Sequence, residues 1–136
     1  MPGYSGTPLP KKLGIKEGFR VCLVDAPADV RAELQAELAK CELPMCGPID
    51  FAMVFTKSKG ALTKEFARVA DHLASAGMLW VSWPKKASGV ATDVDENVVR
   101  AIGLAAGLVD VKVCAVTEIW SGLKFVRRLK DREKSR

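Results

Sequence analysis

The chain has 136 residues and a mass of 14.7 kDa, and 49% of its residues are hydrophobic and 27% are charged. Such a length and composition are typical of one soluble globular domain, and they argue against a disordered, collagen-like or membrane-spanning chain. The formal net charge is +5, and residues 127–136 hold six basic and two acidic side chains, so most of the excess lies in a basic tail. That tail could touch phosphates or an acidic partner, or could simply keep the protein soluble.

Residues 1–18 form a polar lead-in to the domain. Residues 1–9 contain Pro, Gly, Ser and Thr but no apolar core of a signal peptide, so we expect a cytoplasmic protein. The lead-in could fold back over the edge of a sheet or stay mobile, as chain ends often do.

The first strand is predicted over residues 19–24, a short apolar run rich in strand formers. Asp25 is well placed as the N-cap of a helix that follows, with Pro27 in its first turn. Apolar side chains recur in this helix at intervals of three and four residues, at Val30, Leu34, Leu38 and Cys41.

Residues 43–48 contain two prolines and predict a short edge strand or only a loop, because proline cannot join a central ladder. A second strand is predicted over residues 51–56, followed by a helix over 59–76 that Gly77 would cap. Residues 78–83 predict a third strand.

A loop over residues 84–92 leads to a helix predicted over 93–106. Thr92 with Asp95, or Asp93 with Glu96, has the spacing of a capping box at its start. Its inward side chains are expected to be Val94, Val98, Ile102 and Ala105. Alternating apolar residues then predict a strand over 109–115, a hairpin connection at 120–122 and a last strand over 123–129.

Three successive strand–helix units predict a mainly parallel sheet, because parallel strands need crossover connections. The terminal hairpin adds one antiparallel strand. We therefore expect an α/β fold, a three-layer Rossmann-like domain over residues 19–129 with helices on both faces of the sheet, followed by a basic tail at 130–136.

The order of elements after the first helix resembles the later half of a class I methyltransferase core. The resemblance rests on the strand at residues 49–55 and on the turn and strand at 74–81, which a helix and a hairpin follow. The resemblance covers about residues 19–129 and implies that fold. Enzymes of this family have a Gly-rich turn after the first strand, where the backbone approaches the cofactor. Residues 24–29 contain no glycine, and the middle of that fold, with its acidic ribose-binding strand end, is also nearly absent. We therefore assign no cofactor and expect Ala26 and Pro27 to fill the space where S-adenosylmethionine would bind.

The chain also resembles a family of short, uncharacterised bacterial proteins that share a domain of unknown function. The resemblance rests on two blocks, residues 3–16 and 83–93, and on the segments 107–114 and 120–126. This resemblance covers nearly the whole chain. It implies the same fold and carries over no established activity.

Ligands of an open parallel sheet bind beyond the carboxyl ends of its strands. Near those ends the sequence has two lysines, a Ser-Gly pair that can turn backbone N–H groups outward and a helix N-terminus, which together predict an anion site. Alternatively, acidic residues at 93–96 cap that helix and the lysines are only solvated. The tryptophans at element ends can line a pocket or close the core. The candidate ligand-binding residues are Asp25, Trp83, Lys85, Lys86, Ser88, Gly89 and Trp120.

The usual catalytic and metal-binding sets are missing from the sequence. His72 is the only histidine and is expected to face water. The four cysteines, Cys22, Cys41, Cys46 and Cys114, lack metal-ligand spacing and are expected to be thiols. No nucleophile elbow, Walker loop or HExxH motif is present.

We therefore incline against an enzyme and expect a non-enzymatic Rossmann-like domain that binds a small anionic ligand or a protein partner at the carboxyl edge of its sheet. The alternative is a degenerate S-adenosylmethionine-dependent methyltransferase-like enzyme. Nucleic-acid binding through the tail is a weaker expectation, and no membrane partner is expected. The exposed edge of the terminal hairpin could pair two copies into a homodimer.

Overall fold

The computed structural model describes residues 8–43 and 47–129. This part of the chain forms four α-helices, one short 3-10 helix and five strands. In chain order they are α1 Leu9–Leu13, β1 Val21–Val24, α2 Ala28–Leu38, β2 Ile49–Phe55, α3 Lys59–Ala70, β3 Leu73–Pro84, η1 Lys86–Ser88, α4 Glu96–Ala105, β4 Leu108–Ala115 and β5 Trp120–Arg127.

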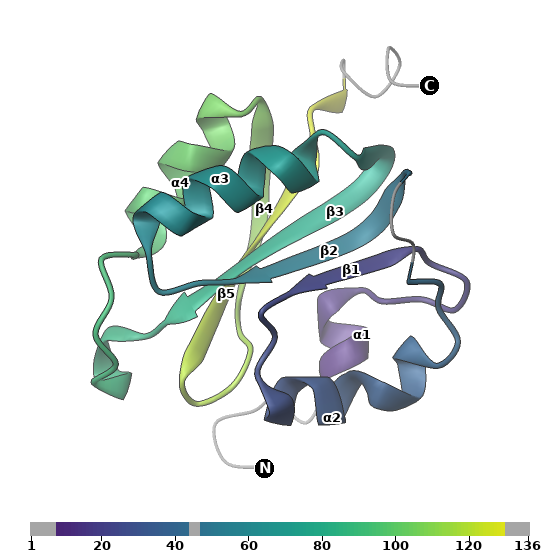
Figure 1. The fold of residues 1–136 in the computed structure, drawn as a ribbon, viewed down its shortest axis with the longest axis horizontal. Helices are drawn as coiled ribbons and strands as arrows, with labels where there is room; N and C mark the ends of the chain where they lie inside the picture. The colour runs from purple at the N-terminus through teal and green to yellow at the C-terminus, as the bar shows by residue number, and fades with distance from the viewer. Residues whose placement is uncertain (1–7, 44–46, 130–136) are drawn as a thin grey trace.

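The five strands form one sheet in the order β1-β2-β3-β5-β4 (Figure 1). β1, β2 and β3 are parallel, and β5 runs antiparallel to both of its neighbours, β3 and β4. Only β5 therefore points against the others. This confirms the predicted mainly parallel sheet with a C-terminal antiparallel hairpin.

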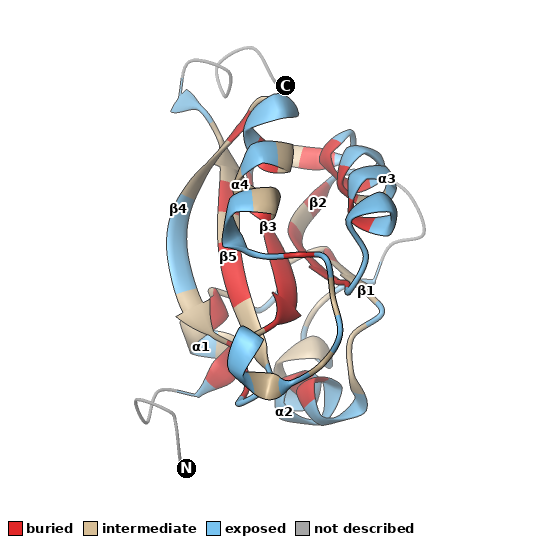
Figure 2. Ribbon diagram, turned by 90° about the vertical axis from the view of Figure 1, so that its left-hand side faces the viewer, coloured by how far each residue is buried: buried red, intermediate tan, exposed pale blue. Residues whose placement is uncertain are grey.

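Helices cover both faces of the sheet, with α3 and α4 on one face and α1 and α2 on the other (Figure 1). We call these the α3 face and the α1 face. Phe66, Leu79 and Phe125 are fully buried on the α3 face, and Leu34, Phe51 and Trp80 are fully buried on the α1 face. The predicted three-layer Rossmann-like fold is thus confirmed. β4, at one edge, is the most exposed of the strands (Figure 2).

The α1 helix lies within the segment expected to be a polar lead-in. Leu9, Leu13 and Ile15 are buried in the core of the α1 face. The indole Nε1 of Trp80 donates a hydrogen bond to the carbonyl O of Leu13 at 2.9 Å. Residues 8–15 therefore cover part of the sheet, and residues 1–7 lie outside the described chain.

The helix predicted over residues 59–76 is wrong beyond Ala70. α3 ends at Ala70, and β3 already begins at Leu73. The guanidinium of Arg127 donates to the carbonyl oxygens of Ala70 and Leu73 at 2.9 and 2.7 Å, a long-range contact that favours the helix end there. Gly77 is not a helix cap, because it lies in β3, where an added Cβ would come within 2.7 Å of the carbonyl O of Ile49.

The start and inward face of the next helix also differ from expectation. α4 begins at Glu96, and the Asp95 side chain caps it by accepting a hydrogen bond from Val98 N at 2.9 Å. Because the helix starts later than predicted, Val99 and Gly103 face the core in place of Val98 and Ala105.

The predicted hairpin connection at residues 120–122 is wrong, because Trp120 opens β5. The turn lies instead at 116–119, where Thr117 Oγ1 accepts hydrogen bonds from the backbone N–H groups of Ile119 and Trp120, each at 3.0 Å. Across residues 8–43 and 47–129, no helix has the length and apolar character of a membrane span.

Candidate functional site

The carboxyl edge of the sheet contains a topological switch point between β1 and β2. β1 leads into α2 on the α1 face, whereas the adjacent β2 leads into α3 on the α3 face (Figure 1). The two connections therefore diverge, and in open α/β sheets the crevice between such connections is where ligands bind. Asp25 and Thr56 directly follow these two strands.

Asp25 has an unusual backbone conformation. Its φ angle is +56°, the left-handed region, and no other non-glycine residue in the described chain has a positive φ. A glycine adopts this conformation readily, whereas a residue with a side chain does so at a cost, which is smaller for aspartate than for most residues. Backbone conformations of this kind cluster at functional sites. The tight turn that a glycine would provide is thus present without one.

The expected N-capping role of Asp25 is wrong. α2 begins at Ala28 and its N-cap is Pro27, and the side chain that bonds to its first turn is that of Asp29, whose Oδ1 accepts from Val30 N at 3.0 Å. The left-handed Asp25 directs the chain away from the helix start, so its exposed carboxylate is not engaged in capping.

Ala26 does not fill the space beyond the strand, contrary to expectation. It packs against the core of the α1 face. Pro27 continues in an extended conformation, with φ −61° and ψ 153°. Of the two residues expected to block a cofactor, one is therefore turned inward, and the other removes only a backbone donor.

The turn after β2 is fastened to the loop before α4. Thr92 Oγ1 donates a hydrogen bond to the carbonyl O of Lys57 at 2.7 Å. Asp93 Oδ1 accepts one from the backbone N–H of Lys59 at 2.7 Å, at the first turn of α3. We call these two hydrogen bonds the loop latch. It holds residues 85–95 against the start of α3.

The latched loop encloses a hollow of about 680 Å³ at the carboxyl end of β3. Trp83, Lys85, Lys86 and Gly89 are among its lining residues. Trp83 is only 6% exposed, so its ring closes the core more than it offers a surface for stacking. Of the two roles expected for a tryptophan at an element end, lining a pocket or closing the core, Trp83 thus mainly has the second.

The acidic residues of the hollow already have partners. Asp93 belongs to the loop latch, Asp95 caps α4, and Glu96 forms an ion pair with Arg100 at 2.7 Å. Lys85 and Lys86 form no ion pair with any residue of the described chain. The hollow therefore has two cationic groups available to a ligand.

The other candidate residues do not join this group. Ser88 shapes the loop, since its hydroxyl donates to the carbonyl O of Lys85 at 2.6 Å and accepts from Val90 N at 3.2 Å. Trp120 packs on the α1 face, where its ring meets Phe55 edge to face at 5.3 Å. Asp25 is absent from the lining of the hollow and lies at the switch point.

Sequence reasoning missed the roles of Thr92 and Asn97. Thr92 appeared only as a capping residue for the next helix, yet it bonds back to the preceding strand–helix connection. Asn97 lines the hollow from the first turn of α4. The sequence around Asn97, the second residue of the helix, contains no pattern that indicates that its side chain faces a cavity.

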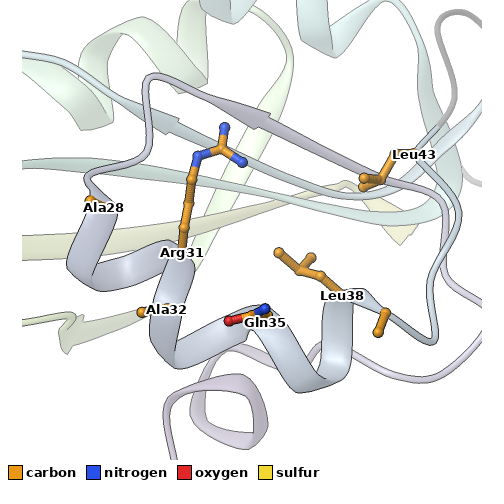
Figure 3. Close-up of a pocket in the computed structure, with 7 residues that line it drawn as sticks. Ala28, Arg31, Ala32, Gln35, Leu38 and Leu43 are labelled. Atoms are coloured by element: carbon orange, nitrogen blue, oxygen red, sulfur yellow. The ribbon is translucent and has the colours of Figure 1, made fainter.

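A second hollow, of about 570 Å³, runs along α2 beside the edge strand β1 (Figure 3). Its walls are mostly apolar and include Leu38 and Leu43, with Arg31 and Gln35 on the helix side. None of the candidate residues predicted from the sequence lines it.

The thiols and the histidine show no catalytic arrangement. Burial raises the pKa of Cys22, Cys41 and Cys114, which disfavours the reactive thiolate. His72 is exposed in the turn between α3 and β3. The described residues contain no cluster of metal-ligating side chains, and Cys46 lies outside them.

Solved structures share this fold at low sequence identity. Magnesium protoporphyrin IX methyltransferase from Synechocystis PCC 6803, with bound SAH, matches 88% of this chain and 78% of its own, at 12% identity and a TM-score of 0.59. A SAM-dependent methyltransferase from Aquifex aeolicus matches 85% of each chain, at 17% identity and a TM-score of 0.59. The fibrillarin pre-rRNA processing protein of Methanococcus jannaschii matches 92% of this chain and 70% of its own, at 10% identity and a TM-score of 0.55.

No protein-family model and no curated protein sequence matches the chain. The structural matches confirm the methyltransferase-like Rossmann fold. They also correct the expectation that the chain is not an enzyme, because the Synechocystis and Aquifex proteins that share this fold are methyltransferases.

Proposed function

We propose that the chain is a SAM-dependent methyltransferase whose methyl donor binds at the switch point between β1 and β2. The observation that carries this proposal is the left-handed Asp25. It makes the sharp turn after β1 for which other proteins use a glycine, and the turn lies where an open sheet binds ligands. The shared fold of the SAM-dependent enzymes supports the same function.

The residues at this point fit the methyl donor in three respects. The exposed Asp25 carboxylate can accept hydrogen bonds from hydroxyl groups of a nucleoside. Ala26 leaves the crevice by packing inward. In the first turn of α2, the backbone N–H of Val30 already donates to Asp29 Oδ1 at 3.0 Å, which leaves the N–H groups of Ala28 and Asp29 to a polar ligand. A donor bound here supplies an activated methyl group for transfer to a nucleophile.

The hollow behind the loop latch is the proposed place for the methyl acceptor. It opens at the same edge of the sheet, at the end of β3, two strands from β1. Lys85 and Lys86 can pair with an acidic group of the acceptor, since neither forms an ion pair within the described chain, while Asp93 and Asp95 in the same hollow are bonded to backbone N–H groups. The small anionic ligand expected from the sequence is thus retained as an acceptor.

Calorimetric titration with SAM and with SAH tests the proposal. We expect saturable binding of both to the full chain. Asp25→Gly keeps the backbone conformation and removes the carboxylate, whereas Asp25→Asn also keeps a side chain that tolerates positive φ. Both variants should weaken binding by about tenfold, the loss of roughly one charged hydrogen bond.

Asp71→Asn is the matched control, because Asp71 is an exposed acid at the C-terminal end of α3, away from the carboxyl edge. It should bind SAM as the unchanged chain does. The absence of a saturable signal with either nucleoside, or an equal loss in the Asp71 and Asp25 variants, would overturn the proposal.

A further inference from the structure

The indole N–H of Trp83 has no hydrogen-bond partner within residues 8–43 and 47–129. Trp83 is 6% exposed, and its ring packs in the core of the α3 face. A tryptophan buried to this extent usually has a partner for its N–H. Trp80, which is fully buried, has one in the carbonyl O of Leu13. Trp83 therefore lacks a contact that its burial leads us to expect.

This N–H opens into the hollow behind the loop latch. Among the described residues that are not exposed, no side-chain nitrogen or oxygen is both sealed from solvent and unpaired. Because Nε1 of Trp83 is unpaired, it is open to solvent. The ring is otherwise packed in the core, and Trp83 lines the hollow of about 680 Å³ at the end of β3. The hollow therefore contains a hydrogen-bond donor on a rigid, buried ring.

The other unengaged polar groups of the hollow are mainly donors as well. The ammonium groups of Lys85 and Lys86 have neither an ion pair nor a hydrogen bond with any described residue. The side-chain amide of Asn97 is likewise without a partner in that part of the chain. An ammonium group only donates, and an amide offers two donor hydrogens beside one acceptor oxygen. A ligand of this hollow therefore needs to supply acceptor oxygens.

The carboxylates that line the hollow are acceptors already in use. Asp93 and Asp95 each accept a hydrogen bond from a backbone N–H, at 2.7 and 2.9 Å. Glu96 pairs with Arg100 at 2.7 Å. These acids keep their charge, however, so they affect which anion can enter.

The charge of the hollow favours a monoanion. Its two lysines, its three acids and the arginine that pairs with Glu96 have a formal charge of zero together. Asp25 and Glu118, the other acids near this edge, are not among the lining residues. A dianion such as a phosphate monoester would meet the repulsion of three carboxylates with twice the charge of a single carboxylate group.

We propose that the hollow takes a small carboxylic acid, whose carboxylate accepts from the Trp83 N–H and pairs with Lys85. Val90, Ala91 and Val94 line the same hollow and offer apolar surface to the rest of the molecule. The Trp83 N–H is the specificity-determining donor, because a buried donor that a ligand leaves unpaired lowers the affinity for that ligand. That this acid is the methyl acceptor rests on the proposed function, whereas its binding does not.

The probe is sodium benzoate, with methyl benzoate as its uncharged and phenyl phosphate as its dianionic counterpart. Nitrogen-15 NMR spectra of the full chain, recorded without SAM, follow the indole N–H signals. Benzoate should move the Trp83 signal saturably and leave that of Trp80, which is bonded to Leu13, in place. The ester and the phosphate should each bind at least about tenfold more weakly, as the loss of a charged hydrogen bond or added repulsion would give.

Three variants separate the donors from the fold. Trp83→Phe removes the N–H and keeps an aromatic ring in the core, and the backbone amide signal of Gly89, which lines the hollow, reports binding in this variant. Benzoate should bind to it about fivefold more weakly, the loss of one hydrogen bond. Lys85→Gln should also weaken binding, and it leaves the core untouched. Lys64→Gln, at an exposed position of α3, should bind benzoate as the wild type does.

A Trp83 signal that does not move, or equal affinities for benzoate and phenyl phosphate, would overturn the carboxylate site. So would equal affinities of the Lys64 and Lys85 variants for benzoate. The titration contains no SAM, so the two proposals fail separately. Benzoate binding without SAM binding would support the carboxylate site and overturn the proposed function, whereas SAM binding with a motionless Trp83 signal would overturn the carboxylate site alone.

Discussion

Gly103 of α4 lies directly against the ring of Phe125 on β5. A Cβ added at Gly103 would come within 2.5 Å of Cζ of Phe125. That ring is fixed from its other side by an edge-to-face contact with Phe66, with centroids 5.3 Å apart. The helix therefore approaches the sheet as closely as it does because residue 103 has no side chain.

Gly103→Ala should accordingly destabilise the fold, although alanine is the better helix former. Overpacking of a filled core costs about 1–3 kcal/mol, which exceeds the gain of about 1 kcal/mol from helix propensity. Urea denaturation measures the change in the free energy of unfolding.

Gly60→Ala is the control for this comparison. Gly60 lies in α3, and its nearest neighbour to an added Cβ is Ser58 Oγ at 3.8 Å. This variant should be neutral or more stable by up to about 1 kcal/mol. Destabilisation by both substitutions to the same extent would contradict the packing argument.

Trp80→Phe should detach α1 from the sheet. The substitution removes the indole donor and leaves the carbonyl O of Leu13 without its partner, in a position where Trp80 is fully buried. The lost hydrogen bond and the smaller side chain together should cost at least about 2 kcal/mol.

Trp120→Phe is the matched substitution, because Trp120 is only half-buried and its ring packs on Phe55. Its cost should be smaller. Hydrogen exchange of the α1 amides is the decisive measurement, since faster exchange is expected in Trp80→Phe but not in Trp120→Phe.

The ion pair between Arg20 and Asp50 should make stability depend on acid pH. Arg20 Nε and Nη2 meet the two carboxylate oxygens at 2.9 and 3.0 Å, and hydrogen bonding to Arg20 lowers the pKa of Asp50. The stabilisation is complete above the unfolded pKa of about 4 and is lost as the pH falls through the lower folded value.

Asp50→Asn should therefore lower the melting temperature by a few degrees at pH 7, with a roughly 1 kcal/mol loss being typical of partly exposed pairs. The difference from the wild type should shrink below about pH 4, because the Asp50 carboxylate of the wild type becomes protonated there and loses its ion pair. A difference that stayed constant between pH 7 and pH 2 would show that the carboxylate charge is not the cause.

Asp93→Ala should release the loop latch. It removes the acceptor for the backbone N–H of Lys59 and should cost about 0.5–2 kcal/mol, as the loss of a helix cap does. Asp95→Ala removes the cap of α4 and should cost a similar amount.

Only the Asp93 variant, however, should loosen the connection to α3. Limited proteolysis within residues 85–93 should therefore be faster in Asp93→Ala than in Asp95→Ala. Equal rates would show that the latch does not hold the loop.

Much of the layer architecture could be predicted because it depends on local patterns. The apolar run ending at Val24 and the stripe of Leu62 and Phe66 specify a strand and a helix whatever surrounds them. The end of α3 could not be predicted, because Arg127, more than fifty residues away, bonds to its last carbonyl. The role of residues 8–15 likewise depends on Trp80, which is distant in sequence.

The candidate site could be predicted in part for a similar reason. The carboxyl edge follows from the order of elements, and Trp83, Lys85, Lys86 and Gly89 meet there because they are close in sequence. The turn after β1 was expected to be blocked because it contains no glycine. The sequence gives no sign that Asp25 adopts a φ of +56° and makes the sharp turn itself. Trp120 could not be assigned to a face without knowing where β5 begins.

Under the proposed function, the conformation of Asp25 sets stability against activity. Glycine at this position would relax the backbone and should raise the free energy of unfolding by up to about 1 kcal/mol. A screen that selects only for heat resistance would therefore favour Asp25→Gly early, and the more stable variant would lack the carboxylate to which we assign binding of the methyl donor.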